Sequence, residues 1–173
     1  MRPIEIGYAI FDRPFDVLRY FLPSLPIAVL AHAGGAIAGD DPVFRLQMSP
    51  YALHYQHSPD HRYVWAVGVE MERKSAVHGI VFFKNSFGQN ALYVYPWGGM
   101  YENLFNNEHV FFKWSIGVLY GYKPPYQDKV PFNFHGYSPA IVPAIGWNFS
   151  SGFSTQLNFL GASGVMLQIS KDL

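Results

Sequence analysis

A hydroxyl, an amide and an amine stand side by side in Lys84-Asn85-Ser86, and His54 lies upstream of them. Acyl transfer needs an acceptor or nucleophilic hydroxyl, a base that takes its proton, and a donor that stabilises the oxyanion. Ser86 offers the hydroxyl, His54 the base and Asn85 an amide donor, while Lys84 adds a positive charge. Buried polar side chains also hydrogen-bond their neighbours for structural reasons. A structural role is therefore the simpler interpretation of these residues taken alone.

Two further histidines, His57 and His61, follow His54 closely. Imidazoles bind metal ions, but no carboxylates or thiols cluster beside them in the sequence. The chain has no cysteine, which excludes disulfides and thiolate metal sites. We predict a solvated loop around His57 and His61, with no metal and no cofactor.

The elements that must position these residues alternate between two kinds of side chain with a period of two, which is typical of β-strands. One set is large and apolar, and the other is small or polar. In the third and fourth runs we expect Val81, Phe83, Tyr93 and Tyr95 on the apolar face, and Lys84 and Ser86 on the polar face, which would be the inner one. In all, about eight runs alternate in this way, over residues 51–56, 63–72, 77–86, 91–97, 110–120, 140–149, 153–159 and 165–173.

Composition narrows the class of protein. The 173 residues suffice for one domain, the formal net charge is zero, and 14% of residues are charged, so no basic face for nucleic acid is expected. Aromatic residues make up 18% of the chain, and no apolar run reaches the ~18 residues of a membrane helix. We predict an all-β fold, an eight-stranded antiparallel transmembrane β-barrel. A soluble β-sandwich or a lipocalin-like barrel is the alternative.

A secretory signal pattern precedes the alternating runs. Arg13 and Arg19 come before the apolar stretch from Leu22 to Leu30, and Ala36-Ile37-Ala38 offers a cleavage site. We predict a signal peptide over residues 1–38, the alternative being a retained segment such as a short helix, and a barrel over residues 39–173. With a periplasmic N-terminus, His54 or His57 and Asn85-Ser86 fall at the exterior end. The inner carboxylates Glu70 and Glu72 could pair with Lys113 or Arg73.

Two sequence motifs resemble those of a known family. Phe83-Lys84-Asn85-Ser86 resembles the Phe-Lys-Asp-Ser strand tip of the lipid A palmitoyltransferases of the bacterial outer membrane. The stretch from Pro139 to Pro143, followed by Gly146-Trp147, resembles that family's Pro-x-x-x-Pro strand and its Gly-aromatic pair. The similarity covers approximately residues 48–170, in patches.

The resemblance implies an enzyme that moves a palmitoyl-type chain from a glycerophospholipid donor to a lipid A acceptor, with the acyl chain held inside the barrel. His54 and Ser86 match the family's essential histidine and serine. Asn85 stands where the family has aspartate, and an amide cannot take up a proton at neutral pH. His54 also lies one residue closer to Pro50 than in the family pattern, so His57 is the second choice. We expect a monomer in the outer membrane.

Prolines in the strands suggest a route for lipid. Proline has no N–H and removes a bond from the β-ladder, so Pro50, Pro139 and Pro143 should weaken pairing locally. In the family, such gaps resemble lateral openings to the outer leaflet, and Lys84 lies at the same end. Room inside the barrel could come from glycines, with the following candidates: Gly68, Gly117 and Gly146.

Two other functions remain open. A lipid A deacylase on a similar barrel would use a histidine and a serine for hydrolysis, but its His-x-Ser pair on one strand is missing. A non-catalytic barrel that serves as a membrane anchor or adhesion module needs none of these residues.

Overall fold

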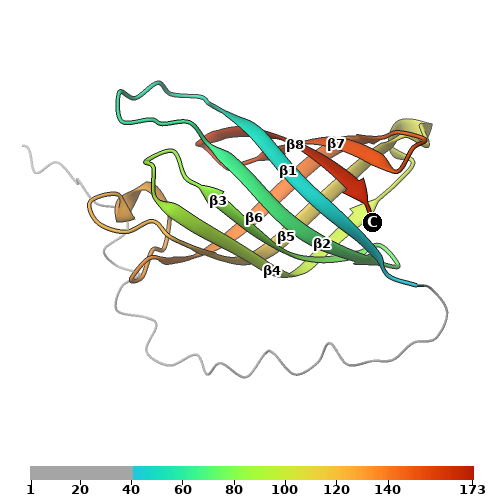
Figure 1. Cartoon of the computed structure of the whole chain (residues 1–173), viewed down its shortest axis with the longest axis horizontal. Coiled ribbons are helices and arrows are strands. Elements are labelled where there is room, and N and C mark those ends of the chain that lie inside the picture. The colour runs from blue at the N-terminus through green and yellow to red at the C-terminus, as the bar shows by residue number, and fades with distance from the viewer. Residues whose placement is uncertain (1–40) are drawn as a thin grey trace, which may run out of the picture. The chain divides into compact units, whose positions relative to one another are not determined.

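The computed structural model describes residues 41–173, which form one closed antiparallel β-barrel (Figure 1). Each strand pairs with the next, and the last pairs with the first. The eight-stranded all-β prediction is therefore confirmed, while the proposed signal peptide over residues 1–38 lies outside the described residues. The strands are β1 (Val43–His54), β2 (Trp65–Arg73), β3 (Ala76–Lys84), β4 (Asn90–Tyr101), β5 (Val110–Tyr120), β6 (Tyr137–Asn148), β7 (Phe153–Phe159) and β8 (Gly164–Asp172).

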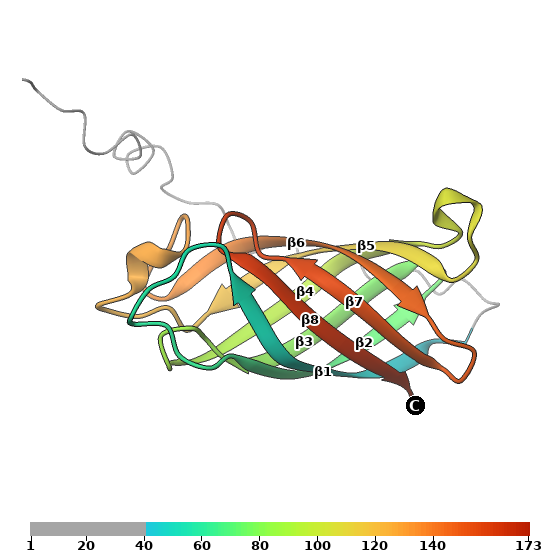
Figure 2. The same cartoon turned by 90° about the horizontal axis from the view of Figure 1, so that it is seen from above.

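The connections divide between the two ends of the barrel (Figure 2). Residues 55–64, 85–89, 121–136 and 160–163 connect strands at one end, called the site end below. The connection over residues 121–136 contains a short 3₁₀ turn, Gln127–Lys129. At the other end, called the terminal end, β1 begins, β8 ends, and residues 74–75, 102–109 and 149–152 connect the strands. No helix among residues 41–173 is long and apolar enough to span a membrane.

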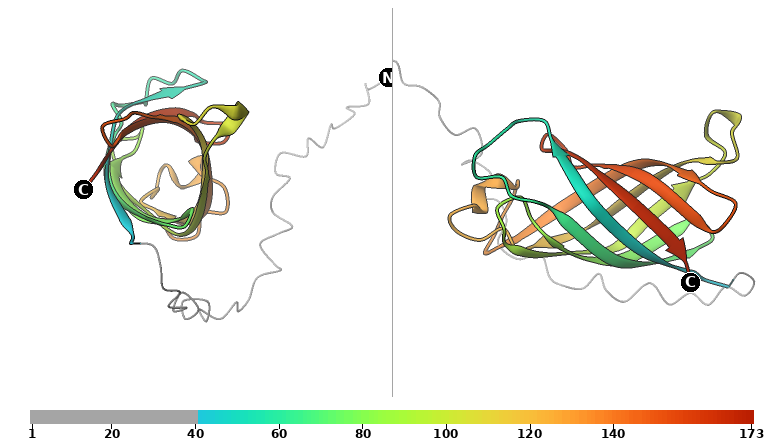
Figure 3. Two further views of the ribbon diagram at one scale, coloured as in Figure 1. Left: turned by 90° about the vertical axis from the view of Figure 1, so that its right-hand side faces the viewer. Right: turned by 45° about the horizontal axis from the view of Figure 1, so that its top comes forward.

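The strands close into a ring in the end-on view (Figure 3). Large apolar side chains cover the outside of this barrel, and polar ones fill much of its inside. Ile141 on β6 is 66% exposed, whereas Gln156 on the neighbouring β7 is 3% exposed. A soluble barrel would show the reverse distribution, because exposed apolar patches of this extent mark contact with lipid or protein. The arrangement fits a small outer-membrane barrel protein. Outward positions include Leu46, Met48, Leu53, Val67, Val69, Ile80, Phe82, Val118, Leu157 and Ile169.

The first strand begins earlier than the alternation suggested. β1 starts at Val43 rather than near Tyr51. Its two halves are joined by a register shift in the ladder to β8 between Met48 and Tyr51. Such a shift changes which face the odd-numbered residues occupy, so the whole strand does not show one continuous alternation.

On β4 the predicted faces are wrong. Tyr93 and Tyr95 point inward and are buried, at 8% and 4% exposure, whereas Trp97 is 49% exposed. The ladder to β5 shifts register between Val94 and Trp97, which places these tyrosines and Trp97 on opposite faces. Gly79 on the neighbouring β3 makes room for Tyr95, because a Cβ at Gly79 would overlap the phenol ring.

On β3 the predicted faces are also wrong. Ile80 and Phe82 are exposed on the outside, and Val77, Val81 and Phe83 point inward. Val77 is fully buried and packs with Met100 and Phe111. Because β3 carries apolar residues on both faces, hydrophobicity alone could not decide which face was inside.

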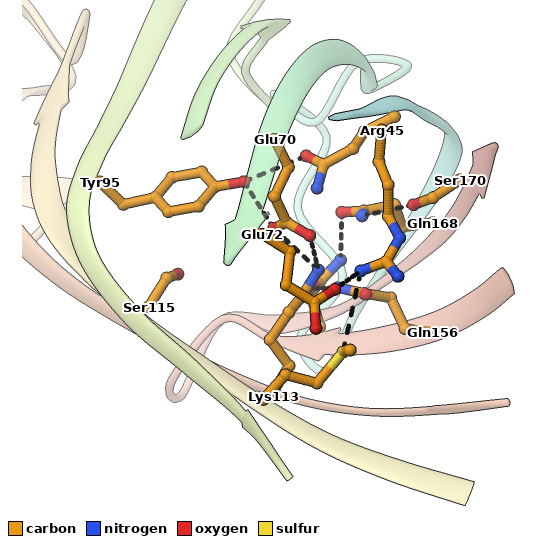
Figure 4. A network of polar contacts seen from close by, with 12 residues as sticks. Arg45, Glu70, Glu72, Tyr95, Lys113, Ser115, Gln156, Gln168 and Ser170 are labelled. Carbon is orange, nitrogen blue, oxygen red and sulfur yellow. Dashed lines mark hydrogen bonds and ion pairs between the residues drawn. The ribbon is translucent and has the colours of Figure 1, made fainter. Parts of the chain in front are cut away.

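Paired charges fill the interior of the terminal half (Figure 4). Lys113 Nζ lies 3.0 Å from both carboxylate oxygens of Glu70, one of the pairings that we predicted from sequence. The Tyr95 hydroxyl donates to Glu70 Oε2 over 2.8 Å. Arg45 binds Glu72, and its Nε donates to Asp172 Oδ1 over 2.7 Å. In this half, the interior is therefore filled by charged side chains that are paired with one another.

The site half of the interior is more apolar and less filled. Phe83, Leu119, Ala140 and Met166 point inward, because their ladder partners on neighbouring strands are buried, yet each is only half-buried. Solvent-sized space therefore remains beside them. Tyr93, whose hydroxyl lies 3.0 Å from Ser115 Oγ, forms the boundary with the polar half.

The candidate glycines do not create that space. The ring of Phe111 occupies the room beside Gly146, and a side chain at Gly68 would clash with Val81. At Gly117 the backbone of β4 approaches closely at its register shift.

Candidate functional site

A bulge in β1 positions the histidine. Pro50 lies within the register shift between Met48 and Tyr51, where its missing N–H breaks no regular ladder bond. Its carbonyl accepts a hydrogen bond from the hydroxyl of Tyr63, which ties β1 to the start of β2. Ala52 is buried beyond the bulge, and His54 follows two residues later on the same inner face, half-buried at the site end.

Asn85 holds the turn between β3 and β4. Its Oδ1 accepts the backbone N–H groups of Phe87 at 3.1 Å and Gln89 at 2.9 Å. Its Nδ2 donates to Gln89 Oε1 over 3.5 Å. The side chain is 1% exposed, and this pattern is an Asx turn. Because both carboxamide atoms bind the turn, the amide that the sequence suggested as an oxyanion donor has a structural role here.

Ser86 contacts a tyrosine that was not singled out in the sequence. Ser86 is 7% exposed, and its side chain lies beside the phenol of Tyr122. Burial raises the pKa of Tyr122 to about 12, although the nearby Ser86 hydroxyl lowers that pKa slightly. The phenol is therefore neutral at physiological pH and keeps its proton as a donor.

Three contacts draw the loops of the site end together. The backbone N–H of Arg62 donates to the Ser86 carbonyl over 2.7 Å. The ring centres of His54 and His61 lie 4.2 Å apart, and those of His61 and Phe87 lie 5.6 Å apart. The structure thus brings His54 and Ser86 to the same end of the barrel. Within residues 41–173, no hydrogen bond joins His54 to Asn85 or Ser86.

The remaining predicted residues lie around this centre. His57 is exposed in the loop after β1. Lys84 is half-buried at the end of β3, two residues after outward-facing Phe82, so it belongs to the outer set and not to the inner set we expected. Among residues 41–173, no three His, Asp or Glu side chains are arranged so that they could hold a metal ion.

A cavity of about 310 Å³ opens between the end of β1 and the connection over residues 55–64. His54, His57, His61 and Arg62 contribute its polar lining. Arg62 and Tyr122 are the site residues that sequence reasoning missed. Arg62 directly follows His61 and could have been found there, whereas nothing in the alternation marks Tyr122, which lies beyond the end of β5.

The prolines of β6 lie where the barrel wall lacks a partner strand. β6 begins at Tyr137, but its ladder to β7 begins only at Ala144. The ladder to β5 runs without interruption from Tyr137 to Trp147. Pro139, Ile141 and Pro143 therefore have β5 on one side and no β7 partner on the other.

The direction of the backbone groups explains why prolines are tolerated there. Asn148 N–H donates toward β5, to His109, whereas Tyr137 N–H donates away from β5, to Phe134. Odd-numbered residues of β6 thus direct their backbone groups toward β7. At the odd positions 139 and 143, proline removes donors that would otherwise be unpaired. Ile141 carries the N–H that remains between them.

Fold and site together define a class: a small barrel of outer-membrane type, with a polar site end and an unpaired section in one strand. No family model and no curated protein matches the chain. The resemblance to lipid A palmitoyltransferases therefore stays a prediction.

Proposed function

We propose that the protein is an outer-membrane acyltransferase that moves a palmitoyl-type chain from a glycerophospholipid to lipid A. The unpaired section of β6 is the observation that carries the proposal. It lies beside the half-filled apolar interior of the site half, where Ala140 of β6 is itself half-buried. An acyl chain entering from the outer leaflet would find apolar side chains there, with Tyr93 below them.

The contacts favour direct transfer over a serine-bound intermediate. His54 makes no hydrogen bond to Ser86 among the described residues, so Ser86 has no base positioned to activate it. In our proposal His54 accepts the proton of the acceptor hydroxyl, whose oxygen attacks the donor's ester carbonyl. The ester bond to glycerol breaks, and the proton passes from His54 to the departing glycerol oxygen. Tyr122, whose phenol oxygen faces Ser86, donates a hydrogen bond to the oxyanion.

The test measures transfer of labelled palmitate from phosphatidylcholine to lipid A by the detergent-solubilised protein. We expect lipid A to gain one acyl chain by mass spectrometry, and His54→Ala to reduce the rate by about 10²-fold or more, the usual contribution of a general base. His135→Asn is the matched control, since His135 has a φ of 52°, which asparagine tolerates. Retained transfer in both His54→Ala and Ser86→Ala would refute the site assignment.

One observation favours a non-catalytic barrel as the second candidate. Both carboxamide atoms of Asn85 bind its own turn, and Ser86 is buried beside Tyr122, so these residues also have a structural role. Unchanged lipid A in cells that express the protein would support this candidate. Loss of one acyl chain would instead indicate a deacylase.

A further inference from the structure

The cavity between the end of β1 and the connection over residues 55–64 is lined by cationic or titratable basic side chains without an acidic one. Three imidazoles and one guanidinium line it, and no carboxylate does. The other lining side chains are uncharged tyrosines, a glutamine and apolar residues. A site with hydrogen-bond donors and no negative charge suits an anion.

Arg62 packs its stem against the turn between β3 and β4, and its guanidinium has no carboxylate partner among residues 41–173. Its backbone N–H is bound to the Ser86 carbonyl, and its Cδ lies 2.9 Å from the place where a Cβ on Gly88 would be. The stem of the arginine therefore rests against the turn that Asn85 organises. Among residues 41–173, no carboxylate forms a salt bridge with Arg62.

The connections around the cavity also carry an excess of positive charge. The connections at the site end and the last residue of β3 hold four cations, Arg62, Lys84, Lys123 and Lys129, against two carboxylates, Asp60 and Asp128. Lys129 Nζ lies 5.7 Å from the centre of the Phe87 ring, which also contacts His61. This excess attracts an anion toward the cavity.

We propose that this cavity binds the phosphate group of a lipid, with Arg62 as the main charged contact and His57 and His61 as further donors. A guanidinium presents paired N–H groups that match phosphate oxygens. The proposal rests on the proposed function in one respect, because His54 lines the same cavity and would face the bound lipid. Phosphate could belong to the glycerophospholipid donor or to the lipid A acceptor.

Binding without turnover tests the proposal. The full chain in a phosphate-free maltoside detergent is titrated with dihexanoyl phosphatidylglycerol by calorimetry at low salt. We expect Arg62→Gln to weaken binding by about tenfold or more, the usual effect of losing a charged hydrogen bond. Arg62→Lys keeps the positive charge but loses the paired N–H groups of the guanidinium, so its affinity should lie between those of the wild type and Arg62→Gln. Lys171→Gln removes a cation at the terminal end and should bind normally.

Competition assigns the source of the phosphate. Inorganic phosphate should displace the bound phosphatidylglycerol. Diphosphorylated lipid A should displace it at a lower concentration than unlabelled phosphatidylglycerol does if the cavity serves the acceptor, and at a higher concentration if the cavity serves the donor. Equal binding by the wild type and Arg62→Gln, or equal losses in Arg62→Gln and Lys171→Gln, would overturn the proposal. Arg62-dependent binding in a chain that transfers no acyl group would refute the acyltransferase and leave the phosphate site intact.

Discussion

Removing one partner of the buried pair between Glu70 and Lys113 should destabilise the barrel strongly. In Lys113→Met, the Glu70 carboxylate, which is 1% exposed, loses its cation. Breaking a buried pair costs about 3–5 kcal/mol. The Tyr95 hydroxyl, 2.8 Å from Glu70 Oε2, remains and offsets part of that loss. We therefore expect a loss of about 3 kcal/mol in the free energy of unfolding.

Equilibrium urea unfolding in detergent micelles measures this loss. With a slope of about 2 kcal/mol per M, the midpoint should fall by about 1.5 M. The double variant Glu70→Gln/Lys113→Met leaves no buried charge and should lie within about 1.5 kcal/mol of the wild type, with a coupling energy of about 2 kcal/mol or more. Lys171→Met controls for loss of an amine near the surface, where Lys171 donates to the Ser151 carbonyl, and should lower the free energy of unfolding by about 1 kcal/mol or less. If Lys113→Met costs no more than Lys171→Met, the interior pair does not stabilise the fold.

Three further outcomes follow from individual contacts. Gly79→Ala should lower the free energy of unfolding by about 1–3 kcal/mol in the same urea assay, because its Cβ would overlap the ring of Tyr95. Asn85→Ala should lower the free energy of unfolding by about 1–3 kcal/mol, because two backbone N–H groups lose their acceptor. Asn85→Asp keeps an acceptor oxygen for these groups and should be about as stable as the wild type. In hydrogen exchange followed by NMR, the amide of Ile141 should exchange faster than that of Ala140, which faces β5; equal protection would mean that β6 is paired on both sides.

The number and order of the strands could be predicted because most of the strands show large apolar residues on one face and small or polar ones on the other over much of their length. The faces of β3 and β4 could not. β3 has apolar residues at both parities, and the register shift between Val94 and Trp97 changes the parity within β4. A bulge depends on how two strands pair, so the residues of one strand do not reveal it.

The candidate site was partly predictable for a related reason. Antiparallel order alone brings the ends of β1 and β3 together, and so places His54 and Ser86 at one end. The contacts of Asn85 depend on the conformation of its own turn, and those of Ser86 on a loop more than thirty residues away. Neither conformation is encoded in the period-two pattern.

The unpaired section of β6 has a consequence for the surrounding lipid. The N–H of Ile141 and the carbonyls beside it have no partner from β7, and backbone groups without partners are costly in hydrocarbon. In the bilayer placement that we propose, water and lipid headgroups must reach down to these groups. The outer leaflet should therefore be locally thinner beside β6 than around the rest of the barrel. A phospholipid at that spot would already have its ester linkage lowered toward the interior of the protein.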